Sequence, residues 1–240
     1  MQDSKNKKLP SFDSITPNLI TILQIAFLVD DYSRYNRIYC LTHKHQADAY
    51  IESYINEIRN KLNIIPAYLH TDRGGEFSAK TFVDKLKGRG ICFEQGPPNS
   101  PQTNGVSEQF NQSLLSKIRC IVGQSNIPTY LWDEAAKHAS FLLNQLPNKY
   151  LKFKSPIDKL DESNSKIEPR IDFNKILPFG IKVIVKNNTT PSKVDMPGRT
   201  MRALTFEPYS DALRVLDPQT GQIKITQDYA VSPNPMSLVL

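Results

Sequence analysis

The segment from His70 to Glu108 constrains this chain more than any other part of the sequence. It contains HTDRGGEF (residues 70–77), a helical pattern, a short apolar stretch (residues 91–94) and PNSPQTNGVSEQFNQSL (residues 98–114). Asp72 is expected to end a strand, and Glu108 is expected to lie on a helix. Two carboxylates placed in this way can share a divalent metal ion when the fold brings them together. The segment therefore predicts a metal-dependent catalytic site that contains Asp72 and Glu108.

A purely structural interpretation of the same two residues is the alternative. Asp72 would cap the helix that follows it, and Glu108 would be a first-turn glutamate favoured by the helix dipole. Two specific motifs seldom occur together at a matching spacing by chance, which favours the catalytic interpretation.

Composition places the chain among globular proteins with a polyanionic partner. Of its 240 residues 39% are hydrophobic, its formal net charge is +6 and its mean hydropathy is −0.42. A basic excess of this kind favours nucleic acid as the partner. No apolar run approaches the roughly 18 residues that a membrane-spanning helix needs, so no membrane is expected. Cys40, Cys92 and Cys120 form no C-x-x-C pair and are expected to be reduced, mostly packed thiols of an intracellular protein.

Apolar patterning over the first 150 residues predicts the strands and helices of an α/β fold. Residues 19–29 are typical of a strand buried on both faces, and a turn at residues 30–33 leads to a second strand at 35–41. A helix at 46–62 and a strand at 64–69 are expected next, followed by a helix that carries Phe82, Val83 and Leu86 and stops at Gly88 or Gly90. A loop without regular structure is expected from Gly96 to Gly105. Two further helices are expected, one from Val106 with a buried stripe of Phe110, Leu114, Ile118 and Ile121, and one over 131–146.

The pattern of apolar and polar residues changes after residue 150. A polar stretch with few apolar anchors predicts a linker over residues 151–177. Short β-like pieces then predict a small β-rich domain and tail over residues 178–240, with a turn at 217–221. The expected strands cover residues 181–185, 203–206, 213–215 and 223–225.

Two motifs resemble those of copia-type retrotransposon integrases. The Gly-Val-x-Glu-x-x-Asn run of that family is similar to residues 105–111, and its Asp-Arg-Gly-Gly-Glu-Phe turn is similar to residues 72–77. More loosely, Phe179-Gly180 and Gln227-Asp228 occupy places that resemble the region after the core in that family. The resemblance covers nearly the whole chain and is sharpest over residues 66–150.

The resemblance implies a fold, an activity and partners. The fold would be an RNase H-like integrase core over residues 1–150, a mixed sheet flanked by helices, followed by the small β-rich domain. The activity would be DNA integration by 3′-end processing and strand transfer, with Mg²⁺ or Mn²⁺ held by Asp72 and Glu108. The partners would be element ends, target DNA and further copies in a homo-oligomer, and the protein would be found in the nucleus and cytoplasm. The residues expected to contact DNA are Arg73, Asn104, Asn111, Gln112 and Lys117.

One feature of that family is missing from this sequence. Integrases of this fold need a third carboxylate, which lies on the first strand of the sheet, and nothing before Leu9 is apolar enough to form that strand. Asp30 would supply a carboxylate but fits a turn better, and Asp3 and Asp13 are weak candidates. We therefore expect an integrase truncated at its N-terminus, with impaired strand transfer.

Two other functions are compatible with the sequence. The first is a non-catalytic nucleic-acid-binding or assembly module that uses the basic surface and the β-rich domain. The second, a ribonuclease of related architecture, agrees less well, because its carboxylates are arranged differently along the chain.

Overall fold

The first elements of the structure form a hairpin. The computed structural model of the chain describes residues 24–43, 46–62, 65–71, 80–95, 101–125, 127–162, 173–186, 198–208 and 210–232. Strands β1 (Gln24–Val29) and β2 (Asn36–Leu41) pair antiparallel. The Asp30 side chain closes the turn between them by accepting hydrogen bonds from the Ser33 backbone N–H at 2.8 Å and the Ser33 hydroxyl at 2.6 Å. The predicted hairpin and its turn are confirmed.

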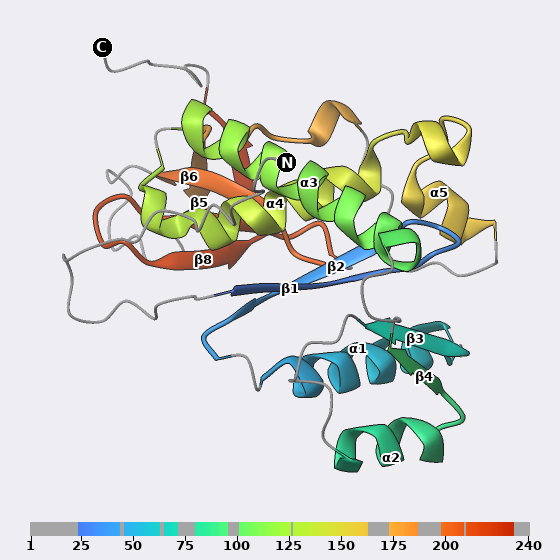
Figure 1. Cartoon of the computed structure of the whole chain (residues 1–240). Helices are drawn as coiled ribbons and strands as arrows, with labels where there is room; N and C mark the ends of the chain where they lie inside the picture. The colour runs from blue at the N-terminus through green and yellow to red at the C-terminus, as the bar shows by residue number, and fades with distance from the viewer. Residues whose placement is uncertain are drawn as a thin grey trace, which may run out of the picture.

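Helix α1 (Ala47–Leu62) covers one face of this hairpin and of a second strand pair (Figure 1). Strands β3 (Tyr68–Thr71) and β4 (Cys92–Gln95) pair in parallel, and α2 (Lys80–Gly88) connects them. Both strand pairs contribute to one apolar cluster under α1, since Leu28 of β1 and Leu69 of β3 pack against it. The buried members of this cluster are Ile51, Ile55, Phe82, Leu86 and Ile91.

Two helices cover the other face of the hairpin. Helix α3 (Pro101–Gln124) is followed by the short 3₁₀ helix η3 (Thr129–Leu131) and by α4 (Trp132–Gln145). Their apolar stripes meet Ile25 and Ile38 in a cluster built on Leu114, Ile118, Ala136 and Ala139. The helix spacing read from the sequence is thus confirmed.

A buried polar contact fixes α4 on the hairpin. Asn36 is 1% exposed and Asn144 is 3% exposed. The Asn36 backbone N–H donates to Asn144 Oδ1, and Asn144 Nδ2 donates to the Asn36 carbonyl, each at 2.9 Å. Since a buried amide is costly unless its donors and acceptors are paired, this contact specifies one alignment of α4 on β2.

The segment predicted as a linker contains helices. Helix α5 (Pro156–Asp161) and the 3₁₀ helix η5 (Phe173–Lys175) lie within it, and η4 (Lys149–Leu151) comes just before it. Ser155 and Asp158 form a reciprocal capping box at the start of α5. Ile157 is 2% exposed and packs against Tyr35. A well-capped helix with one buried isoleucine thus anchors the first part of the segment, and its role as a linker stays a prediction.

The C-terminal part is a five-stranded antiparallel sheet with the order β8-β7-β6-β5-β9. The turn at 217–221 is confirmed: the Gly221 N–H donates to the Asp217 carbonyl at 2.8 Å, and Gly221 adopts φ +71°. The last strand was not anticipated. The strands are β5 (Lys182–Lys186), β6 (Gly198–Phe206), β7 (Leu213–Leu216), β8 (Ile223–Thr226) and β9 (Tyr229–Val231).

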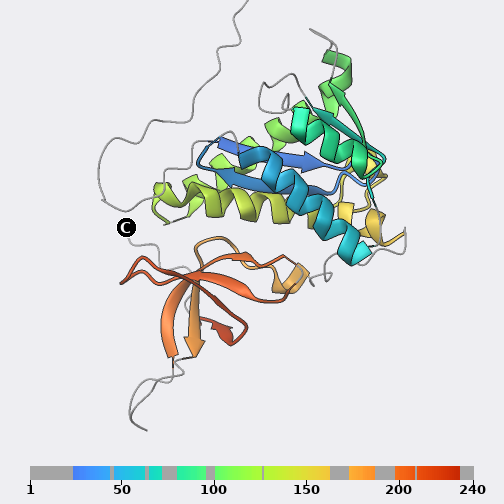
Figure 2. The same ribbon diagram turned by 90° about the horizontal axis from the view of Figure 1, so that it is seen from below.

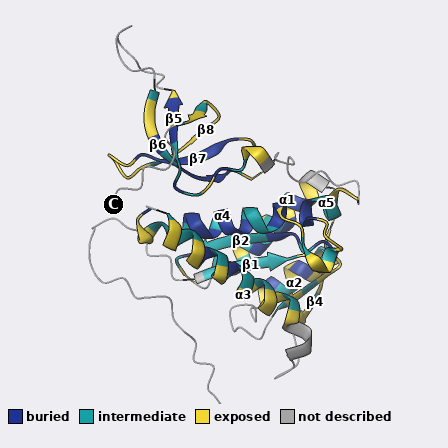
Figure 3. Cartoon of the chain, turned by 90° about the horizontal axis from the view of Figure 1, so that it is seen from above, coloured by how far each residue is buried: buried dark blue, intermediate teal, exposed yellow. Residues whose placement is uncertain are grey.

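Helix α4 lies between the hairpin and this sheet (Figure 2). It is dark blue over much of its length in Figure 3, because it packs on both sides. Phe141 of α4 packs on the cluster inside the sheet, with its ring 5.4 Å from that of Phe206. Ile127, just before η3, joins Leu204 and Leu216 of the sheet in a further cluster. The two parts of the chain therefore share apolar cores.

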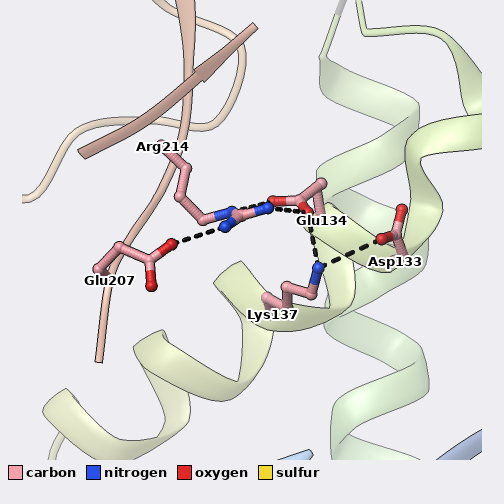
Figure 4. A network of polar contacts seen from close by, with 5 residues as sticks. All are labelled: Asp133, Glu134, Lys137, Glu207 and Arg214. Atoms are coloured by element: carbon pink, nitrogen blue, oxygen red, sulfur yellow. Dashed lines mark hydrogen bonds and ion pairs between the residues drawn. The ribbon is translucent and has the colours of Figure 1, made fainter. Parts of the chain in front are cut away.

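An ionic network reinforces the same junction (Figure 4). Arg214 of β7 donates from Nε and Nη2 to the two carboxylate oxygens of Glu134, each at 2.8 Å, and from Nη1 to Glu207 at 2.6 Å. Lys137 Nζ donates to Glu134 Oε1 at 2.6 Å. Burial alone would raise the pKa of Glu134, but these hydrogen bonds and positive charges outweigh it and hold that pKa below its ordinary value.

Three sequence expectations differ from the structure. Helix α3 begins at Pro101, inside the region 96–105 that was expected to lack regular structure. Proline suits the first turn of a helix, where its missing N–H has no partner to lose. The described residues of β1 after Gln24 are half-buried rather than buried. Cys92 and Cys120 are exposed, and Cys40 is half-buried, which raises the pKa of its thiol to about 12.

None of the helices within the described residues combines the length and apolar character needed to cross a bilayer.

Candidate active site

Helix α3 presents the residues singled out in the sequence. Its apolar stripe faces inward, with the Phe110 ring 5.1 Å from the ring of Phe27 on β1. Glu108, Asn111 and Gln112 lie outside the stripe and are exposed. Residues three and four positions apart are neighbours on a helix surface, so the carboxylate and the two amides form one face. The structure thus brings these three predicted residues together.

Glu108 is free to bind a ligand. Within the described parts of the chain it has neither a hydrogen-bond nor an ion-pair partner. A solvated glutamate flanked by two amides can accept a cation at its oxygens, while the amide N–H groups can donate to phosphate oxygens.

Lys117 does not lie on this face. It follows Glu108 by nine positions, which is about 180° around the helix at 3.6 residues per turn. The residue is half-buried. Of the basic residues near the end of α3, the exposed Arg119 lies closer to the direction of Glu108, about 20° away. Lys117 therefore lies on another side of α3 from Glu108, and its contact with DNA stays a prediction.

Three of the predicted site groups lie outside the described residues. Asp72 and Arg73 follow Thr71, the last residue of β3, and are not described; nor is the side chain of Asn104, although its backbone belongs to α3. The pairing of Asp72 with Glu108 stays a prediction.

Near the end of β3 the structure adds a carboxylate that was not predicted. Glu94 of β4 stands opposite His70, and its Oε2 lies 3.2 Å from His70 Nδ1. Both side chains are about half exposed or more. No sequence pattern points to this contact, since it depends on the register of two parallel strands.

Asp30 is occupied by the hairpin turn. Its Oδ2 accepts both hydrogen bonds from Ser33, and its backbone carbonyl accepts the Arg34 N–H at 2.8 Å. The structure thus gives Asp30 the turn role that the sequence favoured. Asp3 and Asp13 lie outside the described residues.

The described residues supply part of a metal site. Carboxylate oxygen is the donor that Mg²⁺ prefers, so Glu108 fits the ion chemically. No group of three or more His, Cys, Asp or Glu side chains that could hold a metal occurs among the described residues. The ligand set implied by the resemblance is therefore represented here by Glu108 alone.

A loop that the sequence analysis passed over borders this face. Gln109, next to Glu108, donates from Nε2 to the Tyr150 hydroxyl at 2.6 Å. Tyr150 belongs to the run NKYLKFK (residues 148–154), which alternates basic and aromatic residues. That alternation is typical of nucleic-acid-binding segments and was the available signal.

Known proteins with similar sequences are polyproteins of plant transposons. The chain is 27% identical over 164 residues to the retrovirus-related Pol polyprotein from transposon TNT 1-94 of Nicotiana tabacum, covering 65% of this chain and 12% of that protein. It is 30% identical over 135 residues to the retrovirus-related Pol polyprotein from transposon RE2 of Arabidopsis thaliana, covering 56% of this chain and 9% of that protein. The chain therefore spans about a tenth of the length of these relatives. No protein-family model matches it.

Solved structures with a similar arrangement include retroviral integrase cores. The catalytic core domain of BIV integrase shares 22% identity with a TM-score of 0.47, covering 58% of this chain and 86% of that one. The HTLV-2 integrase catalytic core domain in complex with magnesium shares 20% identity with a TM-score of 0.43, covering 55% and 80%.

The similar sequences confirm the resemblance drawn from the motifs. The relatives are retrotransposon Pol polyproteins, as expected for a copia-type integrase fragment. The predicted α/β core followed by a β-rich region is also confirmed.

Proposed function

We propose that this chain is a retrotransposon integrase fragment that binds DNA through the exposed face of α3, with impaired integration chemistry. The observation that carries the proposal is the carboxylate of Glu108, which has no partner among the described residues and lies beside the exposed amides of Asn111 and Gln112. The similarity to transposon Pol polyproteins supports it.

Each residue has a defined part in this proposal. Asp72 and Glu108 would hold Mg²⁺ or Mn²⁺, which neutralises charge on a phosphate undergoing in-line displacement. Asn111 and Gln112, with Asn104 about two turns earlier, donate to phosphate oxygens and set the register of the DNA. Arg73 adds a phosphate contact by charge, and Lys117 acts from the side of the helix rather than beside Glu108.

Integration would be impaired without a third carboxylate beside Asp72 and Glu108. Mg²⁺ is held by few protein carboxylates, so the loss of one weakens the site sharply. Asp30 is committed to its turn. The described residues also form two separate two-stranded sheets, β1-β2 and β3-β4, where the resemblance implies one mixed sheet.

A DNA-joining assay tests this proposal. The purified chain would be incubated in Mg²⁺ or Mn²⁺ with a short duplex carrying a recessed end, beside Asp72→Asn and Glu108→Gln variants. Asp84→Asn is a matched control, because Asp84 is an exposed carboxylate on α2. We expect a folded chain that binds DNA without joining it. Joining that is lost in both site variants and kept in the control would contradict the impairment.

A non-catalytic nucleic-acid-binding module is the second candidate. The net charge of +6 favours it. It predicts salt-dependent DNA binding that survives both Asp72→Asn and Glu108→Gln, because phosphate contacts by basic residues do not require a metal. Either function places the protein inside the cell, in nucleus and cytoplasm, with DNA and further copies of itself as partners.

A further inference from the structure

The loop from Asn148 to Lys154, called here the aromatic loop, is tightly closed on itself. The Asn148 N–H donates to the Lys154 carbonyl at 2.9 Å, and the Asn148 carbonyl accepts from Leu151 N and Phe153 N, each at 3.0 Å. Asn148 Oδ1 accepts the Tyr150 N–H at 2.9 Å. One asparagine thus organises the whole loop, which is a fixed structure rather than a flexible connection.

This fixed loop presents two aromatic rings to solvent. Tyr150 is 68% exposed and Phe153 is 73% exposed, more than any other large apolar side chain of the described residues. Phe153 adopts φ +63°, and Lys152 before it adopts φ +53°. Side chains other than glycine rarely adopt this left-handed conformation, and such strain tends to persist at functional sites.

The charges of the loop are available to a ligand. Lys149 and Lys152 are exposed, and within the described parts of the chain neither forms an ion pair. Lys154, in contrast, pairs with Glu162. The loop therefore combines two aromatic faces with two unneutralised ammonium groups.

The aromatic loop borders the face of α3 that carries Glu108. The hydrogen bond from Gln109 to the Tyr150 hydroxyl joins the two segments, and Gln112 lies one turn further along the same helix. In Figure 1, α5, which follows the loop, lies at the same end of the molecule as the beginning of α3. A DNA strand held at Glu108 would therefore have the aromatic loop at its side.

We propose that the aromatic loop is a stacking site for unpaired DNA bases, in which Tyr150 and Phe153 contact the bases and Lys149 and Lys152 contact the phosphates. Aromatic faces stack on any base, and lysines track the backbone, so such a site recognises single-stranded ends without reading their sequence. The phosphates of a nucleic acid would pair with both ammonium groups while its bases stack on the rings, which favours nucleic acid over a protein surface. This inference rests on the proposed DNA-binding function and names the part of DNA that the chain recognises.

The test compares two DNA probes by fluorescence anisotropy. One probe is a blunt 20-base-pair duplex, and the other is the same duplex with a four-nucleotide unpaired 3′ end. The full chain is expected to bind the probe with the unpaired end more tightly. Tyr150→Ala and Phe153→Ala should each weaken binding of that probe by about 5- to 100-fold, the range for loss of one stacked base, and should change blunt-duplex binding by less than about twofold.

Three controls separate stacking from other effects. Tyr150→Phe keeps the ring and should retain binding. Tyr130→Ala removes an aromatic ring that is 41% exposed beyond the far end of α3, and should have no effect. Phe153→Trp places an indole in the loop, and its fluorescence should be quenched by the unpaired end and not by the blunt duplex.

The outcomes distinguish this inference from the function on which it rests. Equal affinity of the unaltered chain for both probes, or equal losses on both probes in the alanine variants, would overturn the stacking site while leaving DNA binding intact. Binding of neither probe would overturn the proposed function and the inference together. If the alanine variants kept their DNA affinity and the loop instead captured a protein partner, the stacking site would be overturned and the loop would be a protein-binding surface.

Discussion

His138 is a buried histidine whose surroundings offer nothing to a charged ring. It is 3% exposed on α4, and its ring centroid lies 6.0 Å from that of Phe141 and 5.6 Å from that of Phe179. Its Nδ1 has no hydrogen-bond partner among the described residues. Burial lowers its pKa from 6.5 to about 4. The neutral ring therefore packs as an apolar group between the helix and the β-rich region.

This shift predicts acid sensitivity. Because the folded-state pKa is depressed, the unfolded chain takes up a proton between pH 6.5 and about pH 4 and the folded chain does not. The stabilisation is present above pH 6.5 and is lost as the pH falls through that window, by about 3 kcal/mol in total. Urea unfolding at pH 7 and pH 5 measures it. His138→Phe should show a smaller drop between these values, and an equal drop would contradict the assignment.

The elements differ in how many neighbours support them. Strand β6 lies between β5 and β7 in the five-stranded sheet, with Met201, Ala203 and Leu204 buried. Strand β3 pairs with β4 alone among the described strands, and its residues are half-buried or exposed. Two-stranded pairs are marginal in water without further packing. An open strand edge also invites pairing with another chain, so self-association is expected at β1 and β3.

Amide hydrogen exchange should separate these two strands. The backbone of β6 opens only when the sheet unfolds, whereas β3 opens locally, so β6 amides are expected to exchange roughly tenfold or more slowly. Mass spectrometry of peptides that cover residues 198–206 and 68–71 compares them directly. Similar protection of both strands would mean that β3 has a further partner. Repeating the measurement at several protein concentrations shows whether that partner is a second copy.

At the scale of the whole molecule, α4 makes the core and the β-rich sheet one cooperative unit. The apolar clusters around Ile127 and Phe141 include residues from both parts. Glu134 adds a charged contact across the junction; it is 1% exposed and accepts both hydrogen bonds of the Arg214 fork. Removing one partner of a buried ion pair leaves the other charge buried without compensation. This lowers the stability of the fold more than replacing both partners by apolar residues would.

Glu134→Gln should therefore destabilise the entire fold. We expect a loss of roughly 3–5 kcal/mol in the free energy of unfolding, because Arg214 and Lys137 lose their shared carboxylate. Urea unfolding followed by circular dichroism measures the change, and a single transition is expected for both proteins. Glu162→Gln is the control, since the ion pairs of Glu162 with Lys154 and Lys159 lie in solvent and should contribute little. A separate early transition of the β-rich sheet would show that the two parts are not coupled.

The sequence alone determined those features that depend on local spacing. The apolar period of α3 placed Phe110, Leu114 and Ile118 inward, and with them left Glu108, Asn111 and Gln112 exposed. Turn residues fixed the hairpin at Asp30 and the turn at Asp217. Such features follow from steric and hydrogen-bonding preferences within a few residues, so they can be read directly from the chain.

Only the tertiary structure decided which distant segments meet. Glu134 and Arg214 lie 80 positions apart, Asn36 and Asn144 lie 108 apart, and Gln109 and Tyr150 lie 41 apart. No spacing rule links such pairs, because each depends on how whole faces of helices and sheets pack together. The place of α4 between the hairpin and the β-rich sheet, and the place of the aromatic loop beside Glu108, were settled in this way. The spacing of apolar residues determines which side of an element is buried, and the packing of these buried sides determines which elements become neighbours.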